Sequence, residues 1–273
     1  MGHFRSRLAM GLVVLLTFTG RVLQAVELDR ENLPPAQELL DRVAATLPAV
    51  PLRVQGQLQS KTRSGDVEKI LNTEMFLDWH AEPSMARYTL RDAFGASLES
   101  LTVLWHPGNE AEYLYFSGDP LKGRPLPNLY ERIQESDISW IDLSLSYLWW
   151  PYGRTIGVEE VKGRECYIVD IPSPTPDTNT YAGVRIWIDP QVSMLLQAVA
   201  YNLQNQELKK LEVKSFKKIN KVWMIRDVEV QNLLTGHKTM LRVRQVEEKE
   251  RKAPDEDEPA EEIAPVESLS PAP

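Results

Sequence analysis

The chain has 273 residues, a net charge of −8 and a single cysteine. Residues 1–25 carry +3 and residues 247–273 carry −7, which leaves −4 for residues 26–246. A mildly acidic body with no visible basic patch argues against nucleic acid as a partner. The lone Cys166 excludes an internal disulfide.

The first residues have the three-part layout of a secretory signal peptide. Arg5 and Arg7 precede an apolar run over residues 8–18, and small Ala25 closes the segment before an acidic residue. The apolar run is too short to span a bilayer comfortably. We therefore expect residues 1–25 to be removed and the mature protein to be exported and soluble. The alternative is an uncleaved amphipathic anchor.

A helix is predicted directly after this segment, in the stretch "LPPAQELLDRVAATLPAVP". Leu39, Leu40, Val43 and Leu47 recur at helical spacing, and prolines stand at both ends as start and stop signals.

From residue 52 onward the apolar period is two, which predicts β-strands. Residues 52–91 contain three strand-length runs, and residues 97–118 contain two more around the turn "HPGN". Strands resume with "RTIGVEEVKGRECYIVDIP" and continue in five further runs up to residue 247 with short, hairpin-like separators. The pattern predicts a mainly β (α+β) domain over residues 26–247, with about eleven antiparallel strands. Both faces of "SMLLQAVAYN" are apolar, which predicts a strand covered on both sides.

The segment "SDISWIDLSLSYLWWPYG", residues 136–153, is predicted to be a helix with two apolar sides. Ser136 or Asp137 can cap its start, and Pro151 to Gly153 end it. At about 100° per residue, one stripe holds Ile138, Ile141, Leu145, Leu148 and Trp149, and the other holds Trp140, Leu143, Tyr147 and Trp150. Two apolar stripes need two apolar partners.

One stripe is expected to pack on a sheet, and the other is a candidate wall of an apolar ligand cavity. We predict ligand contacts from Trp140, Leu143, Tyr147 and Trp150, and from Trp187 in the strand "GVRIWID". The alternative is that the whole helix is core, since aromatic stripes commonly are. Which stripe faces the sheet is open.

No pattern in the sequence predicts a catalytic group, a metal site or a cofactor. The four histidines lack zinc-ligand spacing, and no nucleophile elbow, P-loop or dinucleotide fingerprint occurs. Cys166 lies in an apolar strand-like run and is expected to be a buried hydrophobe. Residues 248–273 are rich in Glu and Pro without aromatics, and we expect an acidic, disordered tail.

Several motifs in the second half of the chain occur in a familiar order. They are "SDISWIDL", "VKGRECYIVDIPSP", "YAGVRIWIDPQVSMLLQAVAYNLQNQELKKLEV" and "KINKVWMIRDVEVQNLLTGHKTMLRVRQVE". In this order and spacing the chain resembles the LolA-like outer-membrane lipoprotein-sorting proteins over roughly residues 50–247.

The resemblance implies an open antiparallel β half-barrel, with helices covering its concave face and an apolar cavity between them. It implies a non-enzymatic periplasmic carrier that binds acyl chains of lipoproteins or lipids for transfer to the outer membrane. An inner-membrane releasing complex and an outer-membrane acceptor are the implied partners. The alternatives are an RseB/MucB-like lipid or lipoprotein sensor in envelope stress signalling, an envelope hydrolase, and a structural protein with a filled core.

We predict that the mature chain begins near residue 26, because Ala25 ends the cleavage-site pattern. The intact mass of protein recovered from the soluble envelope fraction measures this. Full-length material beginning at Met1 and retained in membranes would contradict it.

Overall fold

In a computed structural model of the chain, the structure describes residues 28–106, 111–219 and 222–250. The predicted signal peptide, residues 1–25, lies outside the described residues, as does most of the predicted tail, residues 248–273.

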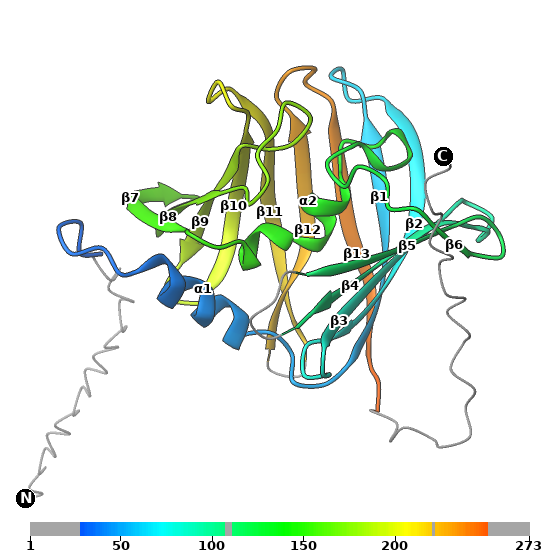
Figure 1. Cartoon of the computed structure of the whole chain (residues 1–273), viewed down its shortest axis with the longest axis horizontal. Coiled ribbons are helices and arrows are strands. Elements are labelled where there is room, and N and C mark those ends of the chain that lie inside the picture. Colours follow the sequence, from blue (N-terminus) through cyan, green and yellow to red (C-terminus); the bar gives the residue numbers. More distant parts are fainter. Residues whose placement is uncertain (1–27, 107–110, 220–221, 251–273) are drawn as a thin grey trace, which may run out of the picture.

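The described residues form one antiparallel sheet of thirteen strands, which is open and not a closed barrel. The strands are β1 (Leu52–Lys61), β2 (Val67–Asp78), β3 (Ser84–Arg91), β4 (Ser97–Trp105), β5 (Glu112–Ser117), β6 (Lys122–Arg124), β7 (Arg154–Val161), β8 (Arg164–Pro172), β9 (Gly183–Asp189), β10 (Met194–Tyr201), β11 (Glu207–Ile219), β12 (Val222–Asn232) and β13 (Lys238–Glu248). Their order is β6-β5-β4-β3-β2-β1-β13-β12-β11-β10-β9-β8-β7. Thus β6 and β7, which are consecutive in the chain, lie at opposite edges of the sheet (Figure 1).

The predicted number of about eleven strands is two too low. The short edge strand β6 lies in a Pro- and Gly-rich stretch that carries no alternating pattern. The run over residues 154–172 is not one strand but the hairpin β7–β8, turned by Lys162 and Gly163. Both turn residues have positive φ, 53° and 76°, as a two-residue hairpin loop of the primed type requires.

The sheet curves, and its concave side carries the main core. On β9 the buried residues Val184, Ile186 and Ile188 belong to this core, in alternation with residues of the opposite face. A second, small cluster lies on the other face around Cys166 and Trp187. Strand β10 contributes to both clusters, which confirms the prediction that it is covered on both sides.

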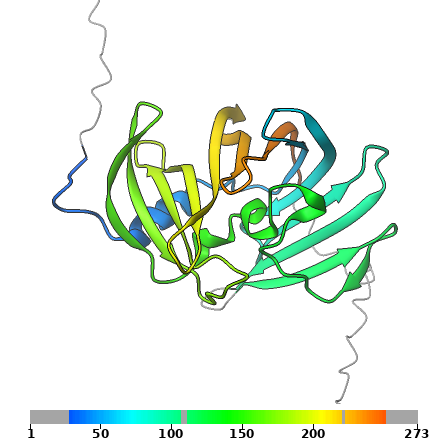
Figure 2. The same cartoon turned by 90° about the horizontal axis from the view of Figure 1, so that it is seen from above.

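The helices are few and short. The predicted early helix is α1 (Ala36–Ala45), whose Ala36, Leu39 and Leu40 are buried in the main core. The connection from β6 to β7 contains α2 (Trp140–Ser144), which lies between the two arms of the curved sheet when seen from above (Figure 2). Full cover of the concave face by helices stays a prediction, because the described residues hold only these two α-helices and two 3-10 turns.

Gly183 sits where a side chain cannot fit, so Gly183→Ala should destabilise the fold by about 1–3 kcal/mol, the usual cost of overpacking. An added Cβ would lie 2.8 Å from the Ile171 carbonyl oxygen and would clash with the Tyr201 hydroxyl. Gly157→Ala is the matched control, because its Cβ would meet nothing closer than 4.0 Å. Urea unfolding of both variants measures the difference. Equal free energies of unfolding would show that the strands around Gly183 can move to accept the added methyl group without loss of stability.

Candidate functional site

The segment predicted as one helix over residues 136–150 is broken into pieces. The 3-10 turn η1 (Ile133–Glu135) precedes α2, and a second 3-10 turn, η2 (Ser146–Trp149), follows it. Between α2 and η2, Leu145 is left-handed, with φ 52° and ψ 32°. A rotation of 100° per residue cannot be carried through such a residue, so the two predicted stripes do not continue beyond Leu145.

The start of α2 is fixed by a capping box, not by the predicted Ser136 or Asp137. The Ser139 hydroxyl accepts a hydrogen bond from the Asp142 amide, and the Asp142 carboxylate accepts one from the Ser139 amide at 2.9 Å. This satisfies two free backbone donors inside the protein.

The Asp142 carboxylate also joins the segment to the sheet. It accepts a hydrogen bond from Lys209 Nζ of β11 at 3.0 Å and from the Tyr181 hydroxyl at 2.9 Å. The Lys209 and Asp142 side chains are only 11% and 7% exposed. Burial, and next the Asp142 charge, hold the pKa of the Tyr181 hydroxyl well above its usual value, so it stays a donor.

A second buried carboxylate, Asp137, anchors the segment to the middle of the sheet. The Thr239 hydroxyl of β13 accepts from the Asp137 amide at 2.8 Å and donates to Asp137 Oδ2 at 3.1 Å, and Ser60 of β1 contacts the same hydroxyl. Asp137 Oδ1 is buried with no hydrogen-bond partner among the described residues. Burial raises the pKa of Asp137, against the lowering effect of the Thr239 hydrogen bond and of Arg132.

An apolar cavity of about 220 Å³ lies between the segment and the concave side of the sheet. The sheet contributes aliphatic and Met side chains from β1, β2 and β10 to β13, and the end of α1 contributes Val43. The segment contributes Ile138, Asp142, Leu143, Ser144, Leu145, Leu148 and Trp149.

The structure places the predicted site residues differently from the prediction. Of the predicted five, only Leu143 lines the cavity; Trp140, Tyr147 and Trp150 are buried in the main core. The other stripe supplies Ile138, Leu145, Leu148 and Trp149 to the lining. The left-handed Leu145 explains the changes after it, because it reorients Tyr147, Leu148, Trp149 and Trp150. Ile138 lies before the N-cap Ser139, so a helical projection does not apply to it. Ligand contact by any of these residues stays a prediction.

Trp187 lies on the opposite side of the sheet from the cavity. Its neighbours Ile186 and Ile188 point into the concave core, so the two-residue period of β9 turns Trp187 to the other face. There its indole N–H donates to Glu159 Oε2 at 2.9 Å.

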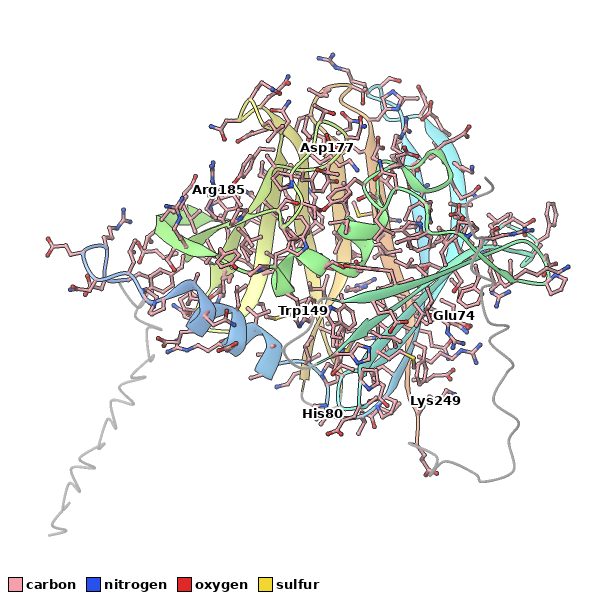
Figure 3. All side chains as sticks on the ribbon, in the orientation of Figure 1. Glu74, His80, Trp149, Asp177, Arg185 and Lys249 are labelled. Carbon is pink, nitrogen blue, oxygen red and sulfur yellow. The ribbon has the colours of Figure 1, made fainter. Side chains whose placement is uncertain are left out.

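Three tryptophans, Trp79, Trp105 and Trp149, cluster beside the cavity, and Trp79 and Trp149 belong to its lining. The sequence analysis did not predict this cluster. The Trp79 and Trp149 rings are parallel within 11° with centroids 5.5 Å apart, and the Trp105 centroid lies 4.8 Å from that of Trp149. Figure 3 shows Trp149 inside the curve of the sheet. Trp79 directly follows β2 and Trp105 ends β4, and these two strands run in the same direction on either side of β3, so both rings lie at the same end of the sheet.

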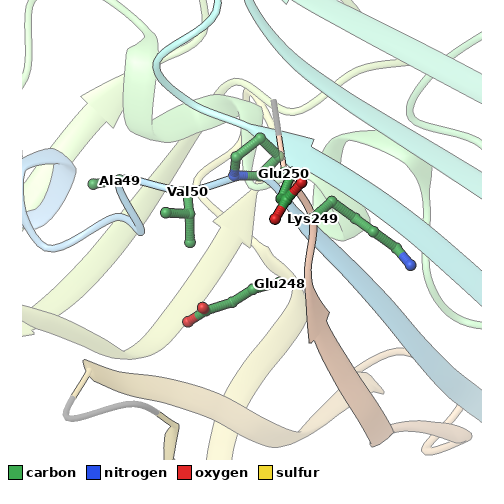
Figure 4. A pocket seen from close by; sticks show the side chains of 6 residues that line it. Ala49, Val50, Glu248, Lys249 and Glu250 are labelled. Atoms are coloured by element: carbon green, nitrogen blue, oxygen red, sulfur yellow. The ribbon is translucent and has the colours of Figure 1, made fainter. Parts of the chain in front are cut away.

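A larger hollow of about 520 Å³ lies near the end of β13 (Figure 4). Its lining consists of residues 49–51 and 248–250. Because Glu248, Lys249 and Glu250 make up half of its lining, this hollow is polar, and the apolar cavity is the better candidate site for an apolar ligand.

Other kinds of site find no support in the described part of the chain. No group of three or more His, Cys, Asp or Glu residues there could hold a metal ion. Within the same residues, no helix has the length and apolar character needed to cross a membrane. Cys166 is fully buried, and burial raises the pKa of its thiol to about 12, so the prediction of a small buried hydrophobe is confirmed.

Comparison with known proteins identifies the fold. A DUF1329 family protein from Desulfovibrio piger is similar, with a TM-score of 0.66 and 14% identity over 80% of this chain and 93% of that one. An outer membrane lipoprotein-sorting protein domain from Vibrio parahaemolyticus has a TM-score of 0.65 and 13% identity over 81% and 94%. A LolA superfamily protein from Nitrosomonas europaea has a TM-score of 0.61 and 12% identity over 81% and 96%.

The chain therefore has a LolA-like fold, as the sequence motifs predict. A family model described only as an uncharacterized protein matches residues 123–256. No curated protein matches the sequence.

Lys209→Met should destabilise the protein by about 3–5 kcal/mol, because it leaves the buried Asp142 carboxylate without its cation. Adding Asp142→Asn should restore part of the loss, since the uncompensated charge is then gone. A double-mutant cycle in urea measures both effects. Additive losses would contradict a direct coupling of the two side chains.

Asp137→Asn should stabilise the protein at neutral pH and have little effect in acid. Burial raises the Asp137 pKa in the folded state, so the folded protein holds this proton more tightly than the unfolded chain. That advantage is present at low pH and is lost as pH rises through the folded pKa. The difference in unfolding free energy between variant and wild type should therefore grow with pH. A difference independent of pH would show that ionisation of the buried Asp137 carboxyl does not lower the stability of the folded protein.

Proposed function

We propose that this protein is a non-catalytic carrier of the periplasm that binds acyl chains of lipoproteins or other lipids. One observation carries the proposal, namely the apolar cavity between the concave side of a LolA-like sheet and the β6–β7 connection. Buried cavities with mainly hydrophobic and aromatic walls are the usual form of sites for apolar ligands.

In this role the cargo comes from a releasing complex of the inner membrane and passes to an acceptor in the outer membrane. The export signal predicted from residues 1–25 supports a periplasmic location. The solved structures of similar fold support the proposal only through the architecture that they share with this chain.

The cavity can expand by moving the segment that forms one of its walls. Leu145 is a non-glycine residue held in a left-handed conformation, and η2 is a single 3-10 turn that continues from it. Both are conformations of low intrinsic stability, so this wall yields more easily than the hydrogen-bonded strands opposite.

Native mass spectrometry and lipid extraction of the full chain, purified from the envelope of its own cells, test the proposal directly. A fluorescent fatty-acid probe then tests the cavity. Leu148→Trp fills the space beside Trp149 and should abolish probe binding, whereas Ile156→Trp changes an exposed residue of β7 outside the lining and should not. Equal probe binding by both variants, or wild-type protein free of any bound lipid and unable to bind the probe, would refute the proposal.

A further inference from the structure

Arg226 is a charged residue in an apolar row of the cavity wall. On β12 the cavity lining consists of Met224, Ile225, Arg226, Val228 and Val230. Arg226 lies where the pairing with β11 steps from Asp227 to Ile225, so it has no partner residue on β11. The other four lining residues are hydrophobic, and Val228 and Val230 are buried. Such a local break of the hydrophobic pattern is typical of functional positions.

Two charged side chains belong to the described cavity lining, Asp142 and Arg226. The Asp142 charge is compensated from within the protein by Lys209 at 3.0 Å. The Arg226 side chain is 55% exposed, and its Nε atom lies 3.8 Å from Asp227 Oδ2, a long and weak ion pair. Asp227 alternates to the other face of β12 and accepts a shorter hydrogen bond from Ser215, 2.6 Å. The cavity therefore carries a cation where it meets solvent.

The backbone around Arg226 is shaped to present this side chain. The pairing of β11 with β12 shifts register on both sides of Ser215, opposite Asp227 and Ile225. Bulges of this kind bend a strand and redirect its side chains, and they occur often beside binding sites.

The volume of the cavity limits how many hydrocarbon chains of a ligand it can hold. A space of about 220 Å³ is smaller than the roughly 300–1,000 Å³ of pockets that enclose drug-sized ligands. As it stands, the cavity has room for part of one hydrocarbon chain, and a second chain would require the wall after Leu145 to move.

From these observations we infer that the cavity takes a single-chain amphiphile whose anionic headgroup, a carboxylate or a phosphate, binds Arg226. The inference rests on the proposed function and narrows the cargo to one charge class. In this arrangement the ligand's hydrocarbon chain lies between Met75 and Leu148. At the water-facing end of the cavity, the Arg226 guanidinium donates two N–H hydrogen bonds to the headgroup oxygens.

Three probes with the same hydrocarbon chain and different heads test the inference: dodecanoate, dodecanol and dodecyltrimethylammonium. Each displaces the fluorescent fatty-acid probe from the full-length mature chain at low ionic strength. Dodecanoate should bind about fivefold more tightly than dodecanol, as expected for one charge-assisted contact at a half-exposed site. Added salt should reduce this preference.

Arg226→Gln should remove the preference for dodecanoate and leave dodecanol binding unchanged, while Arg226→Lys should keep part of it. Arg244→Gln is the matched control, because Arg244 is an exposed arginine of the neighbouring β13 that does not line the cavity. Its affinity for all three probes should equal that of the wild type. Urea unfolding confirms that each variant is folded.

The outcomes separate this inference from the proposed function. Equal affinity for the three probes, tighter binding of dodecyltrimethylammonium, or a preference for dodecanoate that survives in Arg226→Gln would overturn the role of Arg226 and leave the apolar cavity standing. A parallel loss of dodecanol binding in Arg226→Gln would also overturn it, because the arginine would then act through packing. If none of the probes binds the wild-type protein, the proposed function itself is wrong.

Discussion

The architecture depends on one constraint: the chain leaves the sheet at one edge, β6, and returns at the other, β7. The connection must therefore cross the sheet, and its apolar residues place it on the concave side, among the main core. Crossing an apolar face brings backbone polar groups out of water, so they need partners. The capping box of Ser139 and Asp142, the Lys209 ion pair and the Asp137–Thr239 hydrogen bonds supply them. The cavity is the space that this crossing segment leaves unfilled.

Because of these polar contacts, the first half of the β6–β7 connection is held more firmly than the second half. Both buried carboxylates, Asp137 and Asp142, lie before Leu145 and tie that half to β11 and β13. After Leu145 the residues facing the cavity, Leu148 and Trp149, are held by packing, and Trp149 stacks on Trp79. Directional, desolvated contacts resist displacement, whereas an aromatic stack can re-form around an apolar guest.

Sequence periodicity predicts the strands well because a half-buried strand repeats its pattern every two residues. The hairpin β7–β8 was missed since its turn, Lys162 and Gly163, lacks the usual Asn-Gly signature, and β6 is too short to show a period. The predicted segment does border a cavity, but of the five predicted ligand-contact residues only Leu143 is in the lining. A helical projection assumes unbroken geometry, and nothing in "DLSLSYL" marks Leu145 as left-handed. Arg226 was recognisable in principle, since it stands between the apolar residues Ile225 and Val228 of β12, but only the structure shows that this part of the strand borders a cavity.

The pairing of β1 with β13 has a consequence for the order of folding. All other strand neighbours in the sheet are also neighbours in the chain, so β1–β6 and β7–β13 are two local meanders. The β1–β13 ladder, which pairs Leu52 with Glu248, joins them across almost the whole domain. Such non-local closure is slow compared with hairpin formation. The two arms can form early, but the concave side that holds the ligand cavity exists only after the last strand has been added to the first.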